Sequence, residues 1–261
     1  SESSQFVSGL LLSAARFTNG LTLKHEGEHL PSLPHIEMTL HCLRQHGVDA
    51  KQISQTQWRV EPGAISGGQV QIEPDLSNAG PFLAAAMVAG GSVTIPHWPA
   101  STTQVGDEFD GILQQMGATI TRTADALTIT GDTKIRGIDI DLSIGGELAP
   151  VIAALAAIAE SPSRITGIAH LRGHETDRLA ALSNEINKLG AKAVELEDGL
   201  EITPIENPHG CLWLSYEDHR MATAGAIVGL RVPNIEVDDI DCTSKTMPNF
   251  TELWSKMIDA Q

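Results

Sequence analysis

Residues that could do chemistry are concentrated in the stretch 171–178, where two arginines, a histidine and two carboxylates stand close together. Asp177 can cap a helix, and the apolar residues that follow it recur at helical spacing. We therefore predict a helix with Arg178 in its first turn, after a loop that holds Arg172 and His174. Cations beside the free N–H groups of a helix start suit an anionic ligand. The alternative is a charged cap on a solvated surface.

Further cations lie in two later segments, at Arg220 and at Lys245. Arginine suits bidentate recognition of carboxylates or phosphates, and lysine can act as a point charge or a proton donor. Arg178 and Arg220 are thus a candidate anion clamp. Glu147 and Glu175 are candidates for acid/base chemistry. Taken alone, each is more commonly a cap or an ion-pair partner.

The composition excludes several classes of protein. Seventeen basic and thirty-three acidic residues give a net charge of −16, which disfavours nucleic acid or an anionic membrane as a partner. No apolar run approaches the roughly 20 residues needed to span a bilayer, and the first residues lack the basic region of a signal peptide. The cysteines are few and widely separated, so they predict neither a disulfide framework nor a thiolate metal site. We expect a protein of the reducing cytoplasm.

Four segments of the chain share one plan, which is a polar cap, an apolar helix of about ten residues and a β-branched strand. Their caps begin at residues 3, 77, 147 and 218, which are 74, 70 and 71 residues apart. Between these segments lie amphipathic helices that end at Gly47, Gly117 and Gly190, which are 70 and 73 residues apart. An internal repeat of about 70 residues follows from both sets of spacings.

The repeat predicts an α/β fold with inner apolar helices and outer sheets. Apolar helices such as 151–158 must be buried on nearly all sides, whereas the amphipathic helices need only one covered face. The inner helices would then start at a similar level, and their N-terminal dipole ends could converge on one surface. Ser3, Ser77 and Asp218 are therefore candidate ligand-facing positions, although capping alone is their commoner role.

A domain boundary is predicted near residues 71–75, where a strand meets a proline and a new repeat begins. Residues 1–72 then hold one unit, and residues 73–261 hold three, of which the last is incomplete. One unit is too small to close a core comfortably. We therefore expect further sequence ahead of Ser1.

Four spaced motifs together resemble the family of 5-enolpyruvylshikimate-3-phosphate synthase, also called 3-phosphoshikimate 1-carboxyvinyltransferase. These motifs are Ser3-Ser4-Gln5-Phe6, Glu175-Thr176-Asp177-Arg178, Asp218-His219-Arg220-Met221-Ala222 and Thr243-Ser244-Lys245-Thr246. The match covers the whole chain, and the segment 173–182 looks most like the actinobacterial branch.

The resemblance implies a step of the shikimate pathway, in aromatic amino acid biosynthesis. The enolpyruvyl group of phosphoenolpyruvate passes to the 5-hydroxyl of shikimate 3-phosphate by addition and elimination, and phosphate is released. The family needs no metal or organic cofactor. By motif match, shikimate 3-phosphate would be bound by Ser3, Ser4, Gln5, Ser32, Glu147, His170 and His174. Phosphoenolpyruvate would be bound by Gln5, Arg178, Arg220 and Lys245.

Three residues would be catalytic by the same resemblance. Glu147 would replace the family's aspartate at the reacting hydroxyl, and Glu175 and Lys245 would transfer protons at the enolpyruvyl methylene. The chain also departs from the family, because His174, His170 and His35 stand where lysine, asparagine and tyrosine are usual. A histidine in place of the lysine predicts that affinity for shikimate 3-phosphate falls as the pH rises through the histidine range.

The family's fold has two domains of three βαβαββ units each, with the active site between them. The resemblance implies that this sequence starts within the last unit of the N-terminal domain and contains most of the C-terminal domain. A missing front would supply the strand that completes the last unit, and a lysine and an arginine for phosphoenolpyruvate. The segment alone is thus expected to be inactive, and the full-length protein to be a monomer. The alternatives are an enolpyruvyl transferase acting on UDP-N-acetylglucosamine and a catalytically dead anion-binding scaffold.

Overall fold

The structure is a computed structural model that describes residues 4–27 and 33–260. The chain divides into two compact units. Unit 1 is Ser1–Glu73 with Ser101–Val105, and unit 2 is Pro74–Ala100 with Gly106–Gln261. The assignment of residues 1–72 and 73–261 to the two domains of a longer protein stays a prediction.

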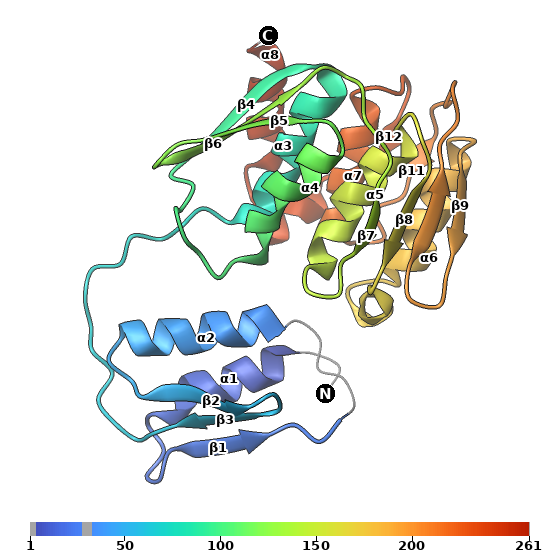
Figure 1. Cartoon of the computed structure of the whole chain (residues 1–261). Coiled ribbons are helices and arrows are strands. Elements are labelled where there is room, and N and C mark those ends of the chain that lie inside the picture. Colours follow the sequence, from blue (N-terminus) through green and yellow to red (C-terminus); the bar gives the residue numbers. More distant parts are fainter. Residues whose placement is uncertain (1–3, 28–32, 261) are drawn as a thin grey trace. The chain divides into compact units, whose positions relative to one another are not determined.

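Unit 1 consists of two helices packed on one sheet. Its elements are α1 (Ser4–Ala14), β1 (Leu21–Lys24), α2 (Leu33–Gln45), β2 (Ala50–Ser54) and β3 (Gln57–Val60). The strands form an antiparallel sheet of order β1-β3-β2, and both helices lie on one face of it (Figure 1). Leu11, Leu40 and Trp58 are the centre of its small core. On α1, the apolar side chains of Phe6 and Leu10 remain 72% and 50% exposed.

Unit 2 contains the remaining elements of the described chain. Its first part comprises α3 (Leu76–Ala89), β4 (Gly91–Pro96), the 3₁₀ turn η1 (Val105–Glu108, at the junction with unit 1), α4 (Phe109–Gln115), β5 (Thr119–Arg122) and β6 (Ala126–Gly131). Its middle part comprises β7 (Asp139–Asp141), the 3₁₀ turn η2 (Gly146–Leu148), α5 (Ala149–Ala157), β8 (Ser163–Thr166), the 3₁₀ turn η3 (Ala169–Gly173), α6 (Arg178–Lys188), β9 (Lys192–Glu195) and β10 (Leu200–Thr203). Its last part comprises β11 (Leu212–Trp213), α7 (His219–Gly229), β12 (Glu236–Val237), the 3₁₀ turn η4 (Asp241–Lys245) and α8 (Phe250–Asp259).

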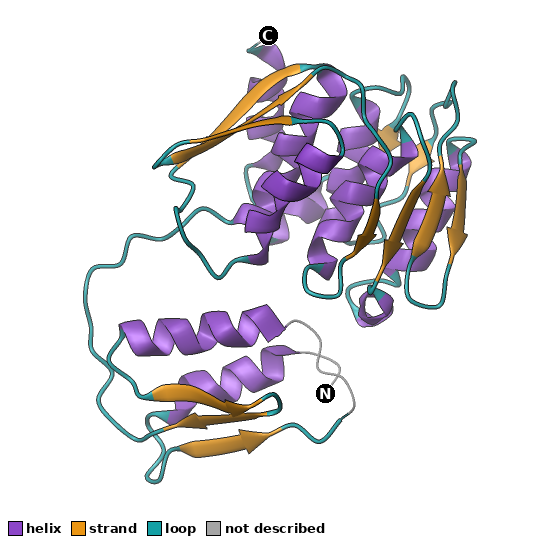
Figure 2. Ribbon diagram, viewed as in Figure 1, coloured by secondary structure: helices purple, strands orange, loops and turns teal. Residues whose placement is uncertain are grey.

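The apolar helices α3, α5 and α7 form the centre of unit 2. All nine residues of α5 are buried, and α5 packs against both α3 and α7. The sheets β4-β6-β5 and β7-β8-β10-β9 lie outside these helices (Figure 2). In the second sheet β7 pairs parallel to β8, whereas the other pairs are antiparallel. The predicted α/β fold with inner apolar helices and outer sheets is confirmed.

The repeat also placed most helix ends correctly. Asp177 and Asp218 cap α6 and α7, and Gly47, Gly117 and Gly190 adopt the positive φ values of 78°, 115° and 90° that glycine tolerates best. Two predicted starts were wrong. Asp75 caps α3 in place of Ser77, because its carboxylate accepts from the backbone N–H of Asn78 at 2.9 Å.

The third inner helix begins at Ala149, with Glu147 in the turn η2 before it. Pro150 explains this start, because proline fits the first turn of a helix, where its missing N–H has no helical partner.

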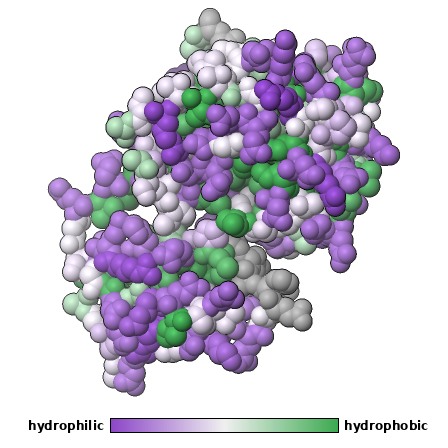
Figure 3. All heavy atoms as spheres, viewed as in Figure 1, coloured by the Kyte–Doolittle hydropathy of each residue, from purple (hydrophilic) through white to green (hydrophobic). Residues whose placement is uncertain are grey.

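None of the helices in the described part of the chain is long and apolar enough to cross a membrane. Polar side chains cover most of the face that Figure 3 shows, with smaller apolar patches between them.

Gly225 is a close-packing position on α7, and it generates a stability prediction. A Cβ atom there would lie 2.7 Å from Cδ1 of Trp213, whose ring is fully buried. We expect Gly225→Ala to lower the free energy of unfolding of unit 2 by about 1–3 kcal/mol, the usual range for overpacking. Chemical denaturation followed by circular dichroism measures this.

The control for that prediction is Gly229→Ala at the end of the same helix. Its Cβ would meet only Ile235, at an ordinary 3.6 Å, so the change is expected to stay below about 1 kcal/mol. Equal stabilities of the two variants would contradict the prediction.

Candidate active site

The site of unit 2 is built on a buried ion pair between two helix starts. Arg178 begins α6 and is 2% exposed, and Asp218 caps α7 and is 0% exposed. Nε of Arg178 donates to Oδ2 of Asp218 at 2.7 Å, and Nη2 donates to Oδ1 at 3.1 Å. Oδ1 also accepts from the backbone N–H of Arg220 at 2.9 Å. Asp218 therefore caps one helix while it orients the first side chain of another.

Glu175 extends this pair toward the surface. Its Oε2 accepts from Nη2 of Arg178 at 2.9 Å, and its Oε1 accepts from Nζ of Lys245 at 2.7 Å. Burial disfavours the charged carboxylate, but the hydrogen bond from Lys245 and the charge of Arg178 outweigh it and lower the pKa of Glu175 to about 2. At neutral pH Glu175 is thus a carboxylate in direct contact with an ammonium group. A proton donor and a proton acceptor lie side by side.

Arg220 brings the starts of the inner helices together. Its Nη1 donates to the carbonyl oxygen of Glu147, in the turn before α5, at 3.2 Å. Burial and the nearby charge of Arg178 lower the pKa of Arg220, whereas the charges of Glu147 and Asp75 raise it. Asp75 is the cap of α3. The N-terminal ends of α3, α5 and α7 therefore converge, as the repeat predicted.

Two histidines lie at the edge of this group. The rings of His170 and His174 are 5.8 Å apart, and Nδ1 of His174 lies 3.3 Å from Nη1 of Arg178. Burial is the main cause that lowers both pKa values, and the charge of Arg178 lowers them further. His219, which begins α7, is affected more strongly, since burial and Arg220 lower its pKa to about 4. Burial therefore favours the neutral imidazole in all three rings.

The charges of the site are already compensated within it. Arg178, Arg220 and Lys245 face the carboxylates of Asp75, Glu147, Glu175 and Asp218. The arrangement orients arginine and lysine side chains near three helix N-termini, which suits an anion. Its net charge, however, offers little excess attraction for a multiply charged one.

The comparisons with known proteins identify the family. Residues 1–254 match the family model described as EPSP synthase (3-phosphoshikimate 1-carboxyvinyltransferase). The chain belongs to the EPSP synthase family. It is 55% identical, over its whole length, to a 3-phosphoshikimate 1-carboxyvinyltransferase of Kocuria rhizophila, and 54% identical, over 99% of its length, to one of Mycobacterium ulcerans. The chain spans 59% and 60% of the length of these two relatives.

Solved structures agree with the fold. An EPSP synthase of Acinetobacter baumannii is similar with a TM-score of 0.81 and 25% identity, over 98% of this chain and 60% of that one. The enolpyruvyl transferase NikO of Streptomyces tendae is similar with a TM-score of 0.70 and 21% identity, over 93% of this chain and 57% of that one. The second likeness shows the shared fold alone.

The site residues expected for this family fall into three groups. The structure brings together in unit 2 Glu147, His170, His174, Glu175, Arg178, Arg220 and Lys245. Unit 1 holds Ser4 and Gln5 at the start of α1, and His35 on α2. Ser3 and Ser32 lie outside the described residues. The ligand contacts of all these residues remain predictions.

Two details of the EPSP synthase motifs escaped sequence reasoning. Arg172 donates to Glu195 at 2.7 Å, to the carbonyl of Leu196 at 2.9 Å and to Asp177, the cap of α6, at 3.2 Å. Asp218 was expected to cap a helix and was a candidate ligand-facing position. It caps α7, and its carboxylate also holds Arg178. The signal that could have found it is an acidic cap directly beside one arginine of the expected clamp.

The buried pair predicts a large effect of Asp218→Asn. The change leaves the guanidinium of Arg178 buried with Glu175 as its remaining carboxylate partner among the described residues. Because breaking one side of a buried pair typically costs about 3–5 kcal/mol, we expect a loss of about 3 kcal/mol in unfolding free energy, measured by urea denaturation.

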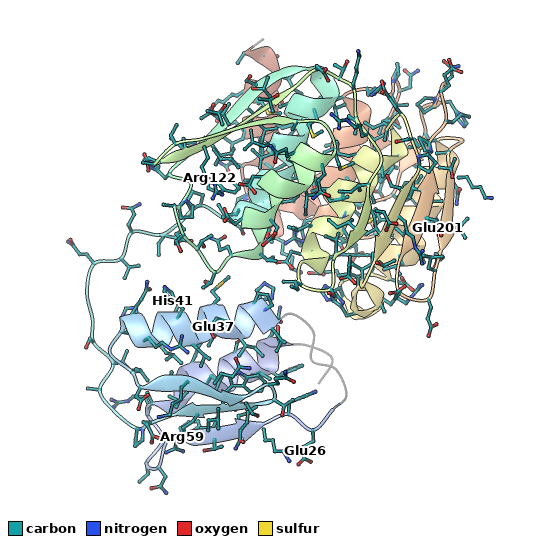
Figure 4. The ribbon with its side chains drawn as sticks, viewed as in Figure 1. Glu26, Glu37, His41, Arg59, Arg122 and Glu201 are labelled. Atoms are coloured by element: carbon teal, nitrogen blue, oxygen red, sulfur yellow. The ribbon has the colours of Figure 1, made fainter. Side chains whose placement is uncertain are left out.

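The matched control is the pair of Arg164 and Glu201, whose side chains are both 53% exposed and 3.9 Å apart. Glu201 lies on β10, on the solvent side of its sheet (Figure 4). Glu201→Gln should change stability by less than about 1 kcal/mol. A similar small change for Asp218→Asn would disprove the importance of the buried pair.

Proposed function

We propose that this chain takes part in the EPSP synthase reaction, the transfer of enolpyruvyl from phosphoenolpyruvate to the 5-hydroxyl of shikimate 3-phosphate. Family membership supports the reaction class. The single observation that carries the proposal is the contact of Lys245 with Glu175, and of Glu175 with Arg178, at converging helix starts. This contact joins a proton donor, a proton acceptor and an anion-binding arginine in one site.

Phosphoenolpyruvate is bound by Arg178, Arg220, Lys245 and Gln5 in this proposal. Arginine forks fit carboxylate and phosphate oxygens, and the start of α7 adds backbone N–H groups. Arg178 is held by Asp218 through Nε and Nη2, so Nη1, which lies 3.3 Å from Nδ1 of His174, is the guanidinium nitrogen without a carboxylate partner among the described residues.

Lys245 and Glu175 transfer the protons. In the addition step the 5-hydroxyl oxygen bonds to C2 of phosphoenolpyruvate and gives its proton to the carboxylate of Glu147, while Lys245 gives a proton to the C3 methylene, which becomes a methyl group. In the elimination step the C2–O bond to phosphate breaks and Glu175 takes a proton from that methyl group. The low pKa of Glu175 keeps it a carboxylate before the reaction, which fits the role of acceptor.

Shikimate 3-phosphate is bound by Ser4, Gln5, Glu147, His170 and His174, together with Ser3 and Ser32. Glu147 contacts the reacting hydroxyl. Its carboxylate charge acts on both His170 and Arg220, so it lies among the groups that would meet the substrate.

We further propose that full activity needs sequence beyond this chain. The chain spans about three-fifths of its curated relatives, and the cations of the site are already offset by carboxylates. Two phosphorylated substrates need additional positive charge. On α1 of unit 1 the apolar side chains of Phe6 and Leu10 are exposed, whereas α3, α5 and α7 bury their apolar side chains against one another within unit 2. The working protein is a monomer of the cytoplasm in this proposal.

The test joins this chain to the remaining two-fifths of the Kocuria rhizophila relative and measures enolpyruvyl transfer. The joined protein should release phosphate with shikimate 3-phosphate as acceptor and not with UDP-N-acetylglucosamine, and the 261-residue chain alone should be inactive. Arg220→Gln in the joined protein should lower kcat/KM at least about 100-fold, because a charge-assisted contact to the anion is lost.

The control variant is Arg164→Gln, on the exposed surface, which should retain activity. Binding of shikimate 3-phosphate without turnover would instead indicate a dead binder. An absence of both would indicate a scaffold, and full activity of the chain alone would contradict the need for more sequence.

His174 predicts a pH dependence of binding. An anionic ligand favours the imidazolium form, so affinity for shikimate 3-phosphate should be highest below the pKa of His174 and fall as the pH rises through it. Because burial lowers that pKa in the free protein, the decline should begin below about pH 6.5. Calorimetry on the joined protein measures this.

His174→Gln is the comparison, since it removes the imidazole while the phosphate group, which also titrates near pH ~6, stays the same. His174→Lys should keep the high affinity to higher pH. Identical pH profiles for the wild type and His174→Gln would exclude the role.

A further inference from the structure

Glu185 is a fully buried carboxylate that the proposed reaction does not use. Its Oε1 accepts from the hydroxyl of Tyr216 at 2.7 Å, and its Oε2 accepts from the backbone N–H of Leu214 at 3.0 Å. Nζ of Lys188 donates to both oxygens, at 2.8 and 2.6 Å. A buried charge is tolerated only when it is paired and hydrogen-bonded, and these donors supply both conditions. The carboxylate thus ties α6 to the segment 214–216.

The position of Glu185 on α6 connects it with the anion site. Arg178 and Glu185 are seven residues apart, which is two helical turns, so they lie on the same face of α6. Arg178 holds Asp218, and Glu185 holds Leu214 and Tyr216. One face of α6 therefore contacts the segment 214–218 at both of its ends.

The segment between these two contacts is strained. Tyr216 and Glu217 both have φ of 56°, in the left-handed region that bulky side chains disfavour. Two such residues in succession persist only where the surrounding structure holds them. Two hydrogen bonds fix this turn. The hydroxyl of Tyr216 donates to Glu185, and the backbone N–H of Ser215 donates to Asp238 at 2.7 Å. The strained turn sets the direction in which Asp218 enters α7.

We propose that Glu185 is a positioning residue for the anion site. It fixes the Leu214–Asp218 segment against α6, so that Asp218 meets Arg178 and α7 starts with Arg220 beside Glu147. The consequence for phosphoenolpyruvate rests on the proposed function, whereas the consequence for the segment itself does not. The alternative is that Glu185 only contributes to the global stability of unit 2.

Hydrogen exchange separates the two roles without a substrate. Tyr216→Phe removes one hydroxyl and keeps the ring, and Glu185→Gln removes the charge but keeps a carbonyl acceptor. Both should speed exchange of the backbone amides at the start of α7, residues 218–222, by about tenfold, since hydrogen bonds to charged groups are the stronger ones. Exchange of the core strand β6 should change less.

The matched control is Ile129→Val on β6, which trims the buried core away from the site. It should speed exchange throughout unit 2 by a similar factor everywhere, because it acts on global stability. If Tyr216→Phe and Glu185→Gln show that uniform pattern as well, the positioning role is wrong. Since Tyr216→Phe removes a single hydroxyl, it keeps the test usable if Glu185→Gln fails to fold.

Binding of phosphoenolpyruvate to the joined protein tests the consequence for the ligand. Calorimetry should give a Kd about tenfold weaker for Tyr216→Phe and for Glu185→Gln than for the wild type, and an unchanged Kd for Ile129→Val. Local loosening with an unchanged Kd would overturn the role in ligand binding. If the wild type itself binds no phosphoenolpyruvate, the proposed function fails, and the exchange pattern still decides whether Glu185 positions the segment.

Discussion

The ion pair between Arg178 and Asp218 is the constraint on which the rest of the site depends. Removing two charges from water costs free energy, and only good geometry and further hydrogen bonds offset that cost. Here Arg178 donates to Asp218 through two nitrogens, Nε and Nη2. Nη2 also donates to Glu175, and Oδ1 of Asp218 also accepts from the backbone N–H of Arg220. Because the pair joins the starts of two helices that lie 40 residues apart in the chain, it fixes these helices to one another.

The remaining charged groups are arranged around this pair in order of increasing exposure. Glu175 bridges from the buried guanidinium to Lys245, whose side chain is 56% exposed. Arg220 is oriented from the backbone side by Asp218 and reaches the turn that holds Glu147. The exposure of the charged side chains thus increases from the buried pair to Lys245. Such a gradient suits a reaction in which positioning is buried and proton transfer takes place at the surface of the site.

The repeat explains why these groups meet. Each 70-residue repeat supplies an apolar helix that must be buried. In unit 2 three such helices pack together and present their N-terminal ends on one side. Aspartates cap α3 and α7 because their carboxylates satisfy free N–H groups, and the same carboxylates compensate the arginines. The same carboxylates therefore cap the helices and balance the charge of the site. Because of this compensation, the site of unit 2 has little excess positive charge to offer an anion.

The sequence by itself determined the repeat, the layer order and the family. Apolar helices, glycine helix ends and aspartate caps are local patterns, so residues such as Asp177, Asp218 and Gly190 could be placed before the structure was known. Only the tertiary structure decided which charges pair. Asp218 meets Arg178, Arg172 turns to Glu195, and Glu185 reaches Tyr216 over 31 residues. Spacing along the chain does not encode such contacts, because they depend on how helices from different repeats pack and on which groups that packing removes from water.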